Sequence, residues 1–141
     1  MIQTKNIYKG IDYKWPTHTN SLLLDRKHAA GTEVFLTTIL PGKFTHSHVH
    51  KDNEQLYYVI EGAGSIVFFK KGATEKSRKR VAVRKNEIVF IPINIEHQVF
   101  CSGKRPLRYL TVDIFPKGKP KDEPTWAVHA KNLKRDTRKS R

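Results

Sequence analysis

The chain has 141 residues and a formal net charge of +14, with 27 lysines and arginines against 13 acidic residues. This length fits one domain with a buried core, and the single cysteine, Cys101, excludes an intramolecular disulfide framework. The N-terminus lacks the apolar run of a signal peptide and no apolar stretch is long enough to span a bilayer, so we expect a soluble, cytoplasmic protein without membrane contact.

Residues 33–115 have the composition of short strands separated by turn residues, without a helical period. The predicted strands are Glu33–Leu40, Phe44–His50, Gln55–Ile60, Ser65–Phe69, Val81–Arg84, Ile88–Ile91, His97–Cys101 and Leu107–Phe115. Many short strands at this spacing favour an all-β sandwich or barrel. We expect residues 1–32 to form an N-terminal arm that includes a first strand near Ser21–Asp25.

The composition changes after Phe115, and residues 116–141 form a separate C-terminal extension. Residues 116–124 are rich in Pro and Lys and predict an extended linker. Asp122 could cap a short helix that places Trp126, Ala130 and Leu133 on one face, so that Trp126 docks on the barrel or on a partner subunit. We expect Lys134–Arg141 to be disordered.

The positive charge gathers in two segments. Residues 103–141 carry twelve Lys or Arg against four Asp or Glu, a net of +8, and residues 76–85 hold a second cluster. The basic residues of that cluster are Lys76, Arg78, Lys79, Arg80, Arg84 and Lys85. Such clusters can attract anionic partners, but they are also typical of a solvated surface. No nucleic-acid-binding motif is present, so nucleic acid is the less favoured partner.

Three histidines alternate in the stretch 45–50, at His46, His48 and His50. On a β-strand, side chains two residues apart point to the same face, so three imidazoles would lie together. Imidazole is the commonest protein ligand of transition metals. The stretch therefore predicts part of a metal site.

The spacing around these histidines resembles the motifs of the cupin superfamily over residues 33–115. Gly42, five residues, His48-x-His50, three residues, Glu54, and then Gly62 match the first motif, and Asn86, Pro92 and His97 follow the second. The resemblance implies a double-stranded β-helix, or jelly-roll, barrel. It also implies one divalent metal ion (Fe, Mn, Ni, Co or Zn) held by His48, His50, His97 and one more side chain.

The chain departs from the second motif at three positions. Asn86 and Asn94 stand where the family has glycine, and asparagine is the residue that next best tolerates a left-handed backbone. Both replacements therefore preserve the turns. Cys101 stands where the family has its final asparagine; it could line the cavity, although a lone buried thiol is more often a small core residue.

Two neighbouring residues are candidates for the fourth ligand. Counting forward from His50 gives Glu54, whereas counting back six residues from Gly62 gives Gln55. Neighbours on a strand face opposite ways, so only one points inward, and the fixed turn at Gly62 favours Gln55. Three imidazoles and an amide would leave the charge of the metal uncompensated, whereas Glu54 would complete a three-histidine, one-carboxylate set.

Other side chains on the predicted inward faces would line the pocket: His46, Tyr57, Val99 and Cys101. On the last strand, Tyr109, Thr111 and Asp113 share one face, and either face could be the inner one. His18, His28 and His129 lie outside the motifs and are interpreted as surface or structural histidines.

The resemblance favours a metalloenzyme of dioxygenase, isomerase, decarboxylase or lyase type that acts on a small polar molecule chelated at the metal, and the basic cluster could favour an anionic one. The alternative is a non-catalytic module that binds or senses a small ligand. By the same resemblance we expect a homodimer that pairs through the N-terminal arm and sheet faces.

Overall fold

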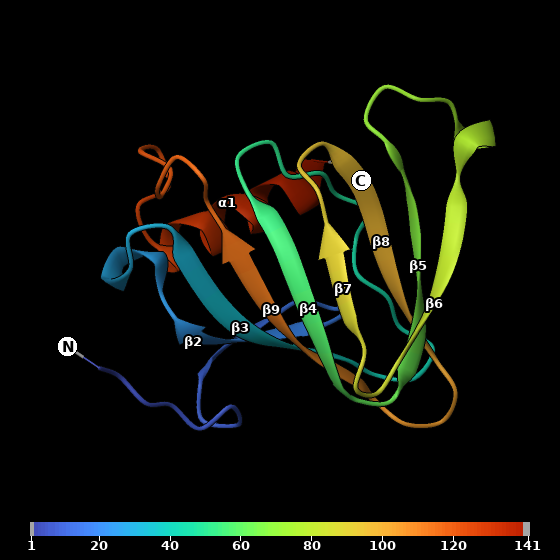
Figure 1. The fold of residues 1–141 in the computed structure, drawn as a ribbon, viewed down its shortest axis with the longest axis horizontal. Helices are drawn as coiled ribbons and strands as arrows, with labels where there is room; N and C mark the ends of the chain where they lie inside the picture. The colour runs from blue at the N-terminus through green and yellow to red at the C-terminus, as the bar shows by residue number, and fades with distance from the viewer. Residues whose placement is uncertain (1, 140–141) are drawn as a thin grey trace.

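Nine strands form two antiparallel sheets in the computed structural model, which describes residues 2–139 (Figure 1). The strands are β1 (Ile11–Lys14), β2 (Thr19–Leu24), β3 (Thr32–Ile39), β4 (Glu54–Glu61), β5 (Ala63–Lys70), β6 (Lys79–Arg84), β7 (Ile88–Ile91), β8 (Ile95–Ser102) and β9 (Leu107–Ile114). The other elements are two single-turn 3-10 helices, η1 (Arg26–His28) and η2 (Glu75–Ser77), and the helix α1 (Trp126–Lys139). The expected all-β jelly roll is confirmed.

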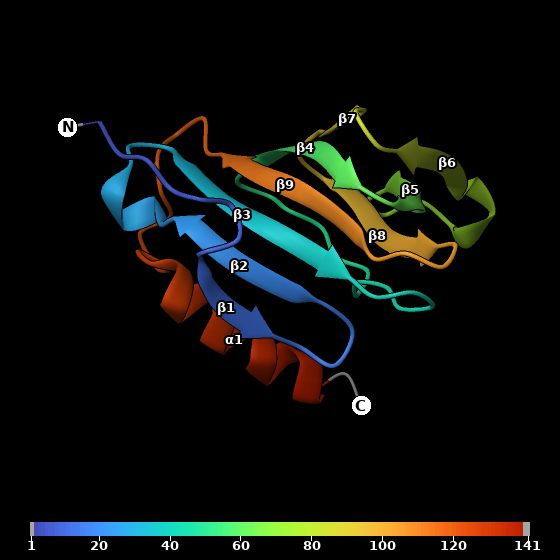
Figure 2. The same cartoon turned by 90° about the horizontal axis from the view of Figure 1, so that it is seen from below.

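The larger sheet has the strand order β1-β2-β3-β9-β4-β7, and the smaller sheet has the order β6-β5-β8. Figure 2 shows α1 lying against one side of the larger sheet, beside β1 and β2, with the smaller sheet beyond β4. Because side chains alternate along a strand, Gln55, Tyr57 and Val59 of β4 are buried on the inner face. On β9 the inner set is the polar one that begins with Tyr109 and ends with Asp113.

The interior divides into an apolar end and a polar end. Along β4 and β9 the inner residues change from Val59 and Leu107, which belong to the main apolar core, to Gln55 and Asp113, which are buried and polar. Burial of polar groups costs free energy unless they are hydrogen-bonded. The polar end is therefore where a functional site is expected.

The histidine stretch is not the regular strand that the sequence predicts, and this expectation was wrong. Residues 44–50 run beside β8 with only isolated bridges, Phe44 to Phe100 and His48 to His97. The amide of Thr45 donates to Val99 O at 2.9 Å, and the amide of His48 donates to His97 O at 3.0 Å. Between these two hydrogen bonds the histidine segment has two residues, whereas β8 has one. Such a bulge reverses the facing of the side chains before it.

The two asparagines do occupy left-handed turns, as the sequence predicts. Asn86 has φ 71° and Asn94 has φ 65°, and they are the described non-glycine residues with positive φ. Gly62 (φ 81°) has a further constraint, because a Cβ there would lie 2.2 Å from Pro106 O. These positions fix the turns that set the register of β4 and β8.

The helix α1 begins later than the sequence predicts. Thr125 caps it in place of Asp122, since its Oγ1 accepts a hydrogen bond from Val128 N at 3.2 Å. Trp126 docks against Phe35, with ring centroids 4.8 Å apart, in a second apolar cluster with Leu22 and Ala130. The segment from Lys134 continues as helix to Lys139 where disorder is expected, and residues 140–141 lie outside the described part. No helix within residues 2–139 is long and apolar enough to cross a membrane.

Candidate metal centre

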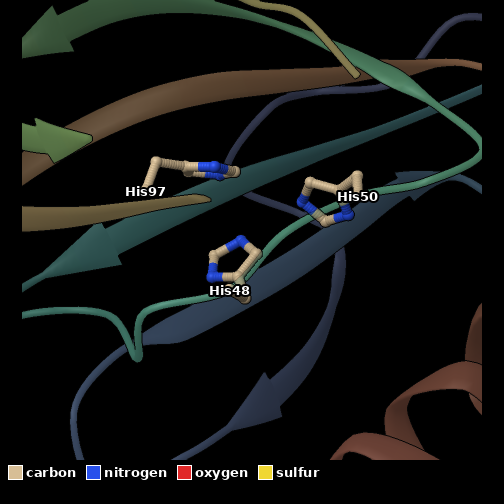
Figure 3. A group of neighbouring side chains, drawn as sticks. All are labelled: His48, His50 and His97. Atoms are coloured by element: carbon tan, nitrogen blue, oxygen red, sulfur yellow. The ribbon is translucent and has the colours of Figure 1, made fainter. Parts of the chain in front are cut away.

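Three imidazoles meet at the polar end of the barrel. His48 and His50 come from the segment before β4, and His97 comes from β8 (Figure 3). Their candidate ligand atoms all lie within 4.8 Å of one another. Ligands about 2.1 Å from one metal ion lie at most about 4.2 Å apart, so the cluster needs to contract only slightly to hold an ion.

Backbone carbonyls fix which nitrogen of two rings is free. His48 Nδ1 lies 2.7 Å from His46 O, and His97 Nδ1 lies 2.9 Å from Ile95 O. A carbonyl oxygen only accepts, so each Nδ1 carries the proton and each Nε2 presents a lone pair. Burial lowers the pKa of His48 and lowers the pKa of His97 to about 3, which keeps both rings neutral and able to bind a metal.

Gln55 presents its amide oxygen to the same point. The side chain is 3% exposed, and its Oε1 lies 3.1 Å from His97 Nε2. Tyr57 donates its hydroxyl to Oε1 at 2.8 Å, while the amide nitrogen donates to Asp113 at 2.7 Å, so the amide is held in this orientation. With the His97 proton on Nδ1, both Oε1 and Nε2 are acceptors, and no hydrogen stabilises their approach.

A cation would stabilise these facing acceptors. Two ligands at right angles, each about 2.1 Å from an ion, lie about 3.0 Å apart, close to the separation seen here. His50 adds a second observation, since its Nε2 is buried without a hydrogen-bond partner. Burial also lowers the pKa of His50 well below its usual value. The donor set therefore fits a transition-metal ion.

A chain of buried polar groups supports Gln55 from behind. Asp113 accepts from Gln55 and also from Asn53 at 3.2 Å, and it is hydrogen-bonded to Glu33. Glu33 in turn accepts two hydrogen bonds from Arg26, at 2.5 and 2.9 Å. Burial raises the pKa of Asp113 well above its usual value, which favours the neutral acid beside the Arg26–Glu33 ion pair.

A cavity of about 270 Å³ opens beside the cluster. Five of the seven histidines in the sequence line it: His18, His46, His48, His50 and His129. His18 and His129 are the residues that sequence reasoning missed, because they lie outside the motifs and reach the cavity only through tertiary packing. Each of them contacts a tryptophan three residues earlier, His18 on Trp15 in the turn before β2 and His129 on Trp126 along α1.

Some of the remaining predicted site residues line the cavity, and others do not. Tyr57 lines the cavity, and His46 does so from an exposed position within the bulge. Val99 and Cys101 follow His97 on the inner face of β8 but belong to the apolar core, and neither is among the described residues that line the cavity. Glu54 is half-buried on the opposite face of β4 from Gln55.

Together, the jelly roll and the histidine cluster define a small β-barrel protein with a candidate metal centre. The chain belongs to the cupin family, since the family model described as Cupin domain matches residues 35–113. A search of curated proteins found no match.

Solved structures with this fold share little sequence with the chain. An uncharacterized Klebsiella pneumoniae protein with a double-stranded β-helix domain has TM-score 0.65 and 15% identity, over 84% of this chain and 95% of that one. The Lactobacillus farciminis oxalate decarboxylase formate complex has TM-score 0.65 and 20% identity, over 74% of this chain. Bacillus subtilis oxalate decarboxylase, with Mn(II) centres, has TM-score 0.65 and 18% identity, over 78% of this chain. The match spans 31% of the length of each decarboxylase.

Proposed function

We propose that this protein is a cupin metalloenzyme that holds one divalent transition-metal ion through His48, His50, His97 and Gln55. The observation that carries the proposal is the set of lone pairs turned toward one point, with the buried Nε2 of His50 unpartnered and the Gln55 and His97 acceptors 3.1 Å apart. Gln55 is preferred to Glu54 because its side chain is on the inner face.

The chemistry proposed for the site is that of a small polar molecule bound through oxygen. A metal ion there would polarise a carbonyl or lower the pKa of a bound hydroxyl or water. The protein would supply the rest: Tyr57 orients the amide of Gln55, and the cavity beside the cluster gives room for the ligand. Dioxygenase, isomerase, decarboxylase and lyase reactions all suit such a site. The similarity to oxalate decarboxylase is a similarity of fold.

Metal analysis of the purified protein tests the centre. We expect about one equivalent of Fe, Mn, Ni, Co or Zn after preparation with these ions supplied. His97→Ala should abolish stoichiometric binding, whereas His28→Ala, which removes an exposed histidine outside the cavity, should not. A wild-type protein that takes up none of the five metals would refute the proposal.

Turnover decides between an enzyme and a non-catalytic binding module. Oxygen uptake and product formation would be measured with the metal-loaded protein and a panel of oxygen-chelating substrates. Activity that is lost in His48→Ala and retained in His28→Ala would support the enzyme. Saturable ligand binding without turnover across the panel would support the binding module.

We also propose that the protein works as a homodimer in the cytoplasm. The outer face of β4 and β7 exposes apolar side chains, among them Tyr58, Ile88 and Phe90, and such a patch is typical of an interface. The free, buried thiol of Cys101 fits a reducing compartment.

A further inference from the structure

Part of the cavity wall comes from outside the Cupin domain match. Trp15 and His18 precede residue 35, and Phe115, Trp126 and His129 follow residue 113. The turn between β1 and β2, the residue that follows β9, and α1 therefore build this part of the wall together. It is a property of this chain and does not follow from the metal motif.

Aromatic rings dominate this wall. Both tryptophans of the sequence line the cavity, together with Phe35 and Phe115. The Trp15 ring stacks on His18 with centroids 5.1 Å apart and an interplanar angle of 7°, so the two flat rings lie parallel where they line the cavity. Flat apolar faces of this kind favour a flat apolar ligand, because offset stacking adds to the burial of apolar area.

The charges of the cavity leave no surplus for an anionic group away from the metal. Among its described lining residues, the fixed cations are Arg26 and Lys51, and the acids are Asp52, Asp113 and Glu123. Arg26 is the buried cation, and Glu33 already takes Nε and Nη2.

The third nitrogen of the Arg26 guanidinium also has a partner. Its Nη1 donates to the carbonyl oxygen of Glu123 at 3.1 Å, while the rings of Phe115 and Trp126 lie 5.1 and 5.8 Å away. The basic cluster at residues 76–85 contributes no described residue to the cavity lining. A ligand that carries charge at both ends would therefore bury its far charge without a partner.

We infer that the ligand of this cavity is a planar, ring-bearing molecule whose charge is confined to the oxygens that bind the metal. The inference rests on the proposed metal centre and names the substrate class for it. A small dianion such as oxalate lacks the ring. The terminal extensions, and Trp15 above all, then determine the specificity of the site.

Hydroxamates with one chelating head and different bodies test the inference. Benzohydroxamate and acetohydroxamate bind a metal through the same two oxygens, and the zinc-loaded protein avoids redox chemistry. Calorimetric titration should show benzohydroxamate binding at least about 10-fold more tightly. Cyclohexanecarbohydroxamate, whose ring is not flat, and 4-carboxybenzohydroxamate, which adds a far charge, should both bind more weakly than benzohydroxamate.

A matched pair of variants assigns the preference to the wall. Trp15→Leu should weaken benzohydroxamate binding about 10-fold and leave acetohydroxamate binding within about 2-fold, because only the stacked face is lost. Phe69→Leu, which changes a ring on β5 of the smaller sheet that does not line the cavity, should alter neither. A loss that is equal for both ligands would show a structural role for Trp15 and would overturn its assignment as a specificity residue.

The wild-type protein alone decides the central point, whatever the variants do. Equal affinities for benzohydroxamate and acetohydroxamate, or tighter binding of the 4-carboxy compound, would overturn the inference. A protein that binds no zinc would refute the metal centre instead. The preference for a ring would then be tested on the metal-free protein by tryptophan fluorescence, since both tryptophans line the cavity. Benzamide should change the emission and acetamide should not. Equal responses to the two compounds would overturn the inference.

Discussion

As the proposed fourth ligand, Gln55 would place a neutral amide where a carboxylate would lower the charge of the metal. An amide oxygen is a weaker ligand than a carboxylate and can turn its nitrogen toward the metal. Here two hydrogen bonds prevent that turn, one from Tyr57 and one to Asp113. Side chains that orient ligands in this way typically change metal affinity 10- to 100-fold when removed.

Removing the Tyr57 hydroxyl should therefore weaken metal binding. We expect Tyr57→Phe to lower the affinity for Zn²⁺ or Mn²⁺ about 10-fold, as measured by competition with a chromophoric chelator. Tyr58→Phe is the matched control, because this hydroxyl lies on the other face of the same strand and contacts Asn86 instead. An unchanged affinity in Tyr57→Phe would show that the amide needs no such support.

The buried histidines predict how stability depends on pH in the metal-free protein. Burial lowers the pKa of His18 to about 4 and that of His97 to about 3, whereas an unfolded imidazole titrates near 6.5. Between these values the unfolded chain binds protons that the folded chain does not. The free energy of unfolding should therefore fall as the pH falls from about 6.5 to about 4, by about 1.4 kcal/mol per pH unit for each such histidine.

Asp113 acts in the opposite direction, because its raised pKa stabilises the folded state at low pH and that contribution is lost as the pH rises. It is one group, whereas burial lowers the pKa of five histidines: His18, His48, His50, His97 and His129. Urea unfolding with a chelator present should give lower stability at pH 5 than at pH 7. Equal or higher stability at pH 5 would contradict the prediction.

The sequence predicts part of the residue-scale picture. Counting back from Gly62 places Gln55 on the inner face, because the turn fixes the parity of β4. Its role as a ligand stays a prediction. His18 and His129 could not be found in this way, because their places depend on how a distant strand and α1 pack across the barrel.

At the scale of elements, the histidine segment shows where a periodic pattern fails. The alternation of His46, His48 and His50 predicts one shared face, but the bulge after Thr45 breaks the register. Nothing in the spacing of the histidines marks this bulge, since it depends on hydrogen bonds to β8. The metal motif still selects His48 and His50, because they follow the bulge and are in register with each other.

The docking of α1 predicts a large effect of Trp126. Its side chain is 2% exposed and packs on Phe35, so Trp126→Ala leaves a cavity between the helix and the sheet. We expect a loss of about 3–5 kcal/mol in the free energy of unfolding, measured by urea denaturation. Val128→Ala, at a 39% exposed position of the same helix, should cost less than about 1 kcal/mol. Similar losses in the two variants would mean that Trp126 is not an anchor.

At the scale of the whole molecule, the sheet register explains the proposed dimer surface. On the outer face, Tyr58 lies opposite Ile88, and Leu56 lies opposite Phe90, so apolar side chains continue across two strands. Face-to-face packing of two such sheets would bury them symmetrically.

Light scattering on a sizing column tests the dimer. The wild-type protein should have about twice the chain mass of 16.3 kDa, and Phe90→Glu should shift it toward the monomer, because a charge at the interface is costly to bury. Val81→Glu, on β6 of the smaller sheet, is the control and should leave the mass unchanged. A monomeric wild-type protein at tens of micromolar would contradict the proposal.

The all-β jelly roll could be predicted because strand length, turn residues and motif spacing all agree at the local level. The two asparagine turns are an example, since their left-handed conformation follows from residue type alone. The pocket could not be predicted in this way, because its walls bring together residues 15 and 126, which are far apart in the sequence. No local pattern encodes that contact.

Asp25 and Arg26 tie the last element of the chain to one of the first. Asp25 accepts a hydrogen bond from Trp126 N at 3.2 Å, and Arg26 donates to the carbonyl of Glu123. Loop closure over about a hundred residues is slow compared with the pairing of neighbouring strands. During synthesis the barrel and its histidines can therefore assemble before the pocket acquires its far wall. Pulsed hydrogen exchange during refolding should protect the amides of β5 and β8 before those of α1, and simultaneous protection would rule out this order.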